Sequence, residues 1–119
     1  MDSNELKERT KQFALRIIRL VDALPNTTAG WAIGKQIVRS GTSVDANYRA
    51  ACRGRSKAEF AAKLGTVAEE ADETCFWLEL IMDGELLPRS QIEPLYTEAD
   101  ELTAIFTSGV RTAQKERTV

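Results

Sequence analysis

The amino-acid sequence predicts an all-α fold: an antiparallel up-down-up-down four-helix bundle formed by a single domain over residues 1–119. The chain contains only three prolines and seven glycines, too few chain breakers for a fold of many strands. Apolar residues recur at spacings of three and four along several long stretches, which is the period of amphipathic helices. Because only short turns separate these stretches, neighbouring helices must run antiparallel.

The first two helices are expected over residues 4–24 and 29–53. Pro25 separates them, because proline lacks a backbone N–H and disfavours helix at the residue before it. A glycine inside a helix costs ~1 kcal/mol relative to alanine, so glycines on a packed face must serve another role. We expect a neighbouring helix to come close to the second helix at the glycines of its packed face, Gly30, Gly34 and Gly41.

Two Ser-x-x-Glu sequences mark the starts of the third and fourth helices. In such a capping box the serine oxygen accepts a hydrogen bond from an N–H of the first turn, and the glutamate reaches back to the cap. The first box starts at Ser56, and its helix is expected to end at Asp83. The second box starts at Ser90 and opens the fourth helix, whose last few residues are expected to fray.

The chain carries a net charge of −2, which gives no overall attraction to nucleic acid or to anionic membranes. No apolar run approaches the ~18 residues of a membrane span, and residues 1–11 lack the apolar centre of a signal peptide. We therefore expect a cytoplasmic protein in which Cys52 and Cys75 remain thiols. Along the helices they lie on the order of 25–30 Å apart, too far for a disulfide.

Three stretches also resemble a known family: residues 36–50, 55–60 and 69–80, which read QIVRSGTSVDANYRA, RSKAEF and EEADETCFWLEL. They are similar to the bacterial four-helix-bundle family, also called the rRNA intervening-sequence or S23 family. The resemblance implies a bundle that assembles into a ring-like homopentamer, and it implies no enzymatic activity. Some relatives, the accessory proteins of diversity-generating retroelements, bind a reverse transcriptase and nucleic acid through strongly basic surfaces. This chain departs from them in its net negative charge, so nucleic acid is not the expected partner.

The outer face of the third helix is a candidate interface. At 100° per residue, with Ala71 at the centre of the buried stripe, Phe76, Trp77 and Leu80 point away from the core. Three large apolar side chains on an outward face favour self-association. In the alternative, the fourth helix or a terminal segment covers them.

Charge is segregated along the chain. Residues 49–57 carry four basic side chains and no acidic one, including Arg53 and Arg55, whereas residues 64–88 carry seven acidic side chains and no basic one. In a head-to-tail ring the basic end of one copy would meet the acidic face of the next. A solvated surface and a contact with RNA are the alternatives.

A row of polar side chains flanks the apolar stripe of the second helix, and Glu98 lies beside the stripe of the fourth. Buried polar groups need hydrogen-bond partners, and a carboxylate beside apolar residues needs a cation or several donors. We expect a polar network that fixes helix register or a subunit contact. A small-molecule pocket is the alternative reading of this set, which comprises Gln36, Ser40, Ser43, Asn47 and Glu98.

Catalytic chemistry finds little support in the sequence. The chain has no histidine, so the Glu-x-x-His pairs of di-iron bundles and the Ser-His and Cys-His pairs of nucleophilic enzymes do not occur. Two acidic pairs, at 70 and 73 and at 98 and 101, resemble the paired motifs of all-α nucleotide pyrophosphohydrolases, which hold Mg²⁺ through carboxylates. Glu70 and Glu73 are, however, expected to point outward.

The sequence thus predicts a non-enzymatic homo-oligomeric scaffold or accessory module, without a metal or other cofactor. Its expected partners are further copies of itself, as a homopentamer by the family resemblance, and an unidentified protein. Two alternatives remain: a Mg²⁺-dependent nucleotide pyrophosphohydrolase and an RNA-binding accessory protein.

Overall fold

The computed structural model describes the backbone of residues 1–118 and the side chains of residues 1–115. Within that part the chain forms four helices and no strand: α1 (Ser3–Ala23), α2 (Thr28–Cys52), α3 (Lys57–Asp83) and α4 (Arg89–Thr118). The observed bounds of α1, α2 and α3 lie within one residue of the sequence prediction. The expected fraying concerns a segment of which Val119, and the side chains from residue 116 on, lie outside the described part.

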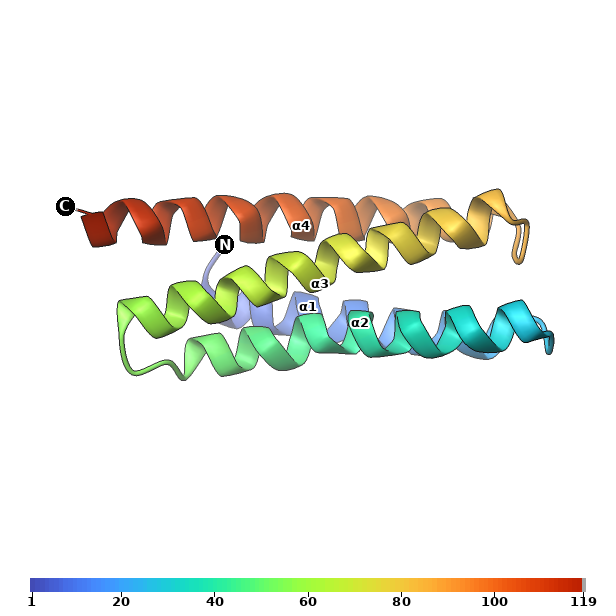
Figure 1. Cartoon of the computed structure of the whole chain (residues 1–119), viewed down its shortest axis with the longest axis horizontal. Helices are drawn as coiled ribbons and strands as arrows, with labels where there is room; N and C mark the ends of the chain where they lie inside the picture. The colour runs from blue at the N-terminus through green and yellow to red at the C-terminus, as the bar shows by residue number, and fades with distance from the viewer. Residues whose placement is uncertain (119) are drawn as a thin grey trace.

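The helices lie side by side along one long axis and form the predicted antiparallel bundle (Figure 1). Consecutive helices pack against each other, and α4 returns to α1 to close the bundle, although these two approach each other at fewer points than the other neighbours. The body measures 50 × 23 × 20 Å. No helix in the described part of the chain is long and apolar enough to span a membrane.

The core runs along the centre of the bundle and receives side chains from every helix. Tyr48 and Phe106 meet near one end, with their ring centroids 5.3 Å apart. Aromatic pairs at this distance stabilise a core beyond the area that they bury. The largest side chains that are fully shielded from solvent include Phe13, Ile17, Ile37, Leu78, Ile92 and Phe106.

Side-chain caps fix the starts of the first three helices. Asp2 caps α1, Thr27 caps α2 and Ser56 caps α3, each accepting a backbone hydrogen bond from the first turn at 2.9–3.0 Å. The prediction for the fourth helix was wrong in detail, because α4 begins at Arg89 and Ser90 therefore lies inside its first turn. The N–H of Gln91 donates to the carbonyl of Pro88 instead, so the helix starts directly after that proline.

Gly41 permits the close approach of α1 and α2. A Cβ atom added there would lie 2.8 and 2.9 Å from the two Cγ atoms of Ile17. At Gly34 the nearest atom would be a methyl group of Leu24, at 3.3 Å. These distances confirm the expected close approach at Gly41 and Gly34. At Gly30 the expectation was wrong, because an added Cβ would clash with the carbonyl oxygen of Pro25 in the turn and not with a neighbouring helix.

Candidate interaction surfaces

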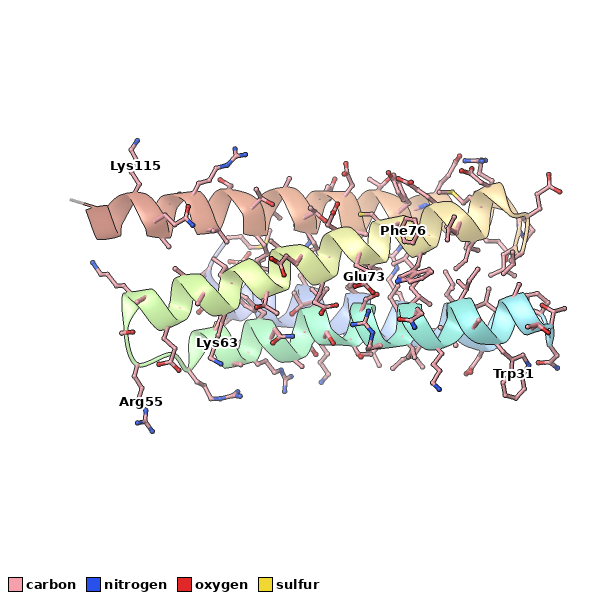
Figure 2. The ribbon with its side chains drawn as sticks, in the orientation of Figure 1. Trp31, Arg55, Lys63, Glu73, Phe76 and Lys115 are labelled. Atoms are coloured by element: carbon pink, nitrogen blue, oxygen red, sulfur yellow. The ribbon has the colours of Figure 1, made fainter. Side chains whose placement is uncertain are left out.

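The outer face of α3 exposes apolar side chains. Phe76 and Leu80 keep 48% and 37% of their surface accessible, and Figure 2 shows Phe76 on the outside of the bundle. We call Phe76 and Leu80 the α3 patch. Neither side chain belongs to the core cluster, so this part of the predicted interface faces solvent as expected.

Trp77 departs from that prediction, because it is half-buried and packs partly against the core. Its indole Nε1–H donates to the carboxylate of Glu73 at 3.0 Å, and its ring meets Phe76 edge-on with the centroids 4.9 Å apart. Trp77 lies one turn beyond Glu73, on the flank of α3 that faces α2. A side chain as large as tryptophan can reach back to the core from that flank, which a helical wheel does not take into account.

A second apolar surface lies on α1 and α2 and was missed by the sequence analysis. Trp31 is 73% exposed and Ile18 is 41% exposed, and Figure 2 shows Trp31 projecting from the end of the bundle opposite Arg55. An open hollow of about 360 Å³ next to Trp31 is lined by residues of both helices, among them Val21 and Val38. The sequence did contain a signal for the exposure of Trp31, because a helical wheel places this residue off the buried stripe of α2.

Basic side chains gather at the end of the bundle that holds the α2–α3 turn. Arg53 and Arg55 are exposed there, and Figure 2 shows Lys63 and Lys115 at the same end as Arg55. We call the side chains Arg53, Arg55, Lys57 and Lys63 the basic end. None of these four forms an ion pair within the described part of the chain. Arg49, which the sequence grouped with them, is paired with Asp45 at 3.5 Å.

The acidic stretch of α3 presents fewer unpaired carboxylates at the surface than its charge count predicts. Most of its carboxylates have partners within the chain. Glu70 and Glu73 pair with Arg39 of α2, and Asp83 pairs with Arg89 at 2.9 Å. Glu79 accepts a hydrogen bond of 2.8 Å from the hydroxyl of Tyr96, which raises the pKa of Tyr96 to about 12. Within the described chain, the acidic side chains of this stretch that remain without a partner are Glu69, Asp72 and Glu85.

Arg9 and Arg39 form ion pairs with the two acidic pairs that resembled a hydrolase motif. Arg9 of α1 binds both oxygens of Glu98 at 2.7 and 2.8 Å and a carboxylate oxygen of Glu101 at 2.7 Å. The hydrogen bond to Glu98 raises the pKa of the Arg9 guanidinium.

The two acidic pairs lie on opposite seams of the bundle. Glu70 and Glu73 face α2 (Figure 2 shows Glu73 on that side of α3), whereas Glu98 and Glu101 face α1. In a ring of four helices the α2–α3 and α1–α4 seams are on different sides. Within the described residues, no three metal-binding side chains come together as a cation site.

The predicted polar row is not one network in this chain. Ser40 is fully buried and accepts a hydrogen bond of 2.9 Å from Thr74 of α3, while the Asn47 side chain donates to the carbonyl of Ser43 on its own helix at 2.9 Å. Gln36 is exposed, because it lies on the outer side of the flank. Glu98 is on the other side of the bundle, bound to Arg9.

Two buried threonines make the polar contacts between helices that the sequence analysis did not identify. Thr74 joins α3 to Ser40 of α2, and Thr10 of α1 donates to the carboxylate of Asp45 on α2 at 3.1 Å. Both are fully shielded from solvent. Each hydroxyl also lies within hydrogen-bond distance of a carbonyl one turn back in its own helix. Its single proton therefore always has an acceptor, and neither threonine leaves an unsatisfied donor in the core.

The described part of the chain is thus an all-α four-helix bundle in which arginines bind paired carboxylates along two seams. The family model described as 23S rRNA-intervening sequence protein matches residues 2–108. The chain belongs to this family, as the three resembling stretches predicted.

A solved structure supports the same assignment. It is the crystal structure of a protein with unknown function from the S23 ribosomal protein family of Bacteroides thetaiotaomicron VPI-5482. The two share 37% sequence identity and superpose with a TM-score of 0.85, over 93% of this chain and 99% of the other. Among curated proteins, no match to the chain was found.

Proposed function

We propose that this protein is a non-enzymatic, homo-oligomeric helical scaffold or accessory module. The observation that carries the proposal is the α3 patch, where Phe76 and Leu80 remain 48% and 37% exposed. Grouped apolar side chains on a surface are typical of an interaction site. Covering them with another copy would contribute roughly 25 cal/mol per Å² of buried apolar area, which offsets part of the cost of association.

A head-to-tail ring accounts for the second apolar surface as well. In such a ring one patch of each copy meets a different patch of the next copy. If the α3 patch of one copy packed against Trp31 and Ile18 of its neighbour, both surfaces would be shielded from water. Five copies per ring is the number that the family resemblance implies.

Charge would set the register of this contact. The basic end offers Arg53 and Arg55 without carboxylate partners in the described chain, and α3 offers Glu69 and Asp72 without basic ones. Complementary charges at the rim of an interface steer association and exclude wrong registers more than they add affinity. In our proposal, the basic end of one copy pairs with these acids on the next copy and so sets the register of the contact.

The α3 patch can be tested with one matched pair of variants. We expect Phe76→Glu to reduce the native mass to that of a monomer, because it places a charge in the proposed contact. Thr66→Glu adds the same charge to an exposed position on the same helix and should leave the mass unchanged. Light scattering after size exclusion measures the mass, and circular dichroism checks that both variants stay helical. A Phe76→Glu variant with the mass of the wild type would reject this face as the interface.

RNA binding is a second candidate, favoured by the unpaired basic end and by the family description. Because the net charge is −2, our proposal expects a structured RNA to bind no more tightly than about 1 µM near physiological salt. Filter binding across a salt series measures this affinity, with the Arg53→Glu/Arg55→Glu variant as the comparison. Tighter binding that falls steeply with salt and is lost in that variant would favour the RNA-binding role.

A further inference from the structure

A cavity of about 420 Å³ opens at the same end of the molecule as the basic end. All four helices contribute to its lining, and most of the lining residues are apolar. Leu64 and Phe106 are buried, whereas Leu6, Phe60 and Ile105 are only partly buried. The partly buried side chains therefore keep apolar surface in contact with water that an occupant would cover.

The cavity lies at the end of the bundle where α1 contributes only Leu6 to the lining. α1 starts at Ser3, and its first apolar side chain is Leu6. Figure 1 shows the N-terminus short of the end that α4 and the α2–α3 turn both reach.

The mouth of the cavity is basic. Lys57 lines it, and Lys57 and Phe60 also line an adjoining open hollow together with Lys7 and Arg55. Nearby carboxylates are engaged in helix caps, since Asp2 accepts from the N–H of Glu5 and Glu59 accepts from the N–H of Arg55. A ligand at this mouth would meet positive charge beside an apolar wall.

The interior offers no hydrogen-bonding group that calls for a polar ligand. Within the described chain, no buried side-chain nitrogen or oxygen lacks a partner. The hydroxyl of Thr112 at the mouth already donates to the carbonyl of Ser108. The part of a ligand that enters must therefore be apolar, and its charged group must stay at the mouth.

We propose that this cavity binds a single free long-chain carboxylate, with its hydrocarbon chain against Phe60 and Ile105 and its carboxylate beside Lys57. The size supports a small ligand, because ligand pockets typically span ≈ 300–1,000 Å³ and are mostly apolar with a few polar groups. This site is separate from the α3 patch, which carries the proposed assembly. Lys57 belongs to the basic end as well as to the cavity lining, so light scattering measures the native mass of each variant beside its laurate affinity and separates loss of ligand binding from loss of assembly.

The experiment is a calorimetric titration of the whole protein with laurate below its micelle concentration. Thr112→Trp should fill the mouth and weaken binding roughly tenfold or more, the result of about 1.4 kcal/mol of lost interaction. Gln114→Trp, which is exposed on the same helix and outside the cavity, should bind as the wild type does. Circular dichroism verifies that both variants remain folded.

The charge is tested with a second pair. Lys57→Glu should weaken laurate binding by at least about two- to fivefold, since one attraction is lost and a repulsion replaces it. Lys63→Glu changes the same net charge outside the cavity lining and should have little effect. Dodecanol, which has the chain without the charge, should bind more weakly than laurate.

Four outcomes would overturn the proposal. The first is no heat of binding with laurate at concentrations up to its micelle limit. The second is equal weakening by Lys57→Glu and Lys63→Glu, which would indicate a general charge effect. The third is wild-type affinity in Thr112→Trp, which would place the ligand elsewhere. Binding to anionic vesicles without binding of monomeric laurate would likewise reject a cavity for a free carboxylate.

Discussion

At Arg9 and at Arg39, one guanidinium group bridges two glutamates that lie three residues apart on the adjacent helix. The sequence shows the acidic pairs as i,i+3 spacings but not the arginines that bind them. Arg9 lies eighty-nine residues from Glu98, and only the packing of α1 against α4 brings them together. The same acidic spacing that resembled a metal site is, in this fold, a way to fasten two helices.

The Arg9–Glu98 contact should be measurable in stability. Both side chains are mostly shielded, with 23% and 17% of their surface exposed, and hydrogen bonds between charged groups contribute ~1.5–3 kcal/mol when well formed. We expect Glu98→Gln to lower the free energy of unfolding by about 1–2 kcal/mol, with a smaller loss at high salt.

Urea unfolding at two salt concentrations gives that free energy. Glu85→Gln is the control, because Glu85 is exposed, has no partner in the described chain and lies outside the proposed contact, so its effect should stay within about 0.5 kcal/mol. Equal effects of the two substitutions would show that Arg9 does not stabilise the α1–α4 seam through Glu98.

At the scale of the helices, most of the fold could be predicted from local signals. Proline at position 25, the caps at 27 and 56 and the spacing of apolar residues each act within a few residues, so the helix bounds follow from the sequence. The start of α4 was not predicted correctly, because two local signals compete there. Pro88 precedes the helix directly, and the serine of the Ser-x-x-Glu sequence was mistaken for the cap.

The candidate site was less predictable because its contacts join residues far apart in the chain. The pairing of Thr74 with Ser40 depends on how α2 and α3 are rotated about their axes. The half-burial of Trp77 depends on the reach of an indole ring from the flank of α3. The exposure of Phe76, in contrast, followed correctly from periodicity, since it lies well away from the buried stripe.

The two interior glycines Gly41 and Gly65 should respond oppositely to the same substitution. Gly41→Ala gains helix propensity of ~1 kcal/mol, but its Cβ would lie 2.8 and 2.9 Å from the branched, fully buried Ile17. Overpacking of this kind costs about 1–3 kcal/mol, so we expect net destabilisation.

Gly65→Ala meets no atom within 4 Å and should stabilise the protein by up to ~1 kcal/mol. Thermal unfolding of both variants beside the wild type decides the comparison. A Gly41→Ala variant that is more stable than the wild type would mean that α1 and α2 can separate slightly without loss.

At the scale of the whole molecule, the core is complete within one chain, yet large apolar side chains remain outside it. Phe13, Ile17 and Phe106 are at most 1% exposed, while Trp31 is 73% and Phe76 is 48% exposed. In our proposal, assembly accounts for this retained exposure, because grouped apolar side chains on a surface are typical of an interaction site. The basic end and the unpaired acids of α3 would give the proposed assembly its direction.

Sedimentation velocity of the unmodified protein tests this account most directly. Over a concentration series from about 1 to 100 µM, a ring closed by the α3 patch should sediment as one oligomeric species at the higher concentrations. Dissociation should occur only on dilution, because binding follows mass action. The account predicts a fitted mass several times that of the 13.2 kDa chain. A single boundary at the mass of one chain across the whole series would contradict it.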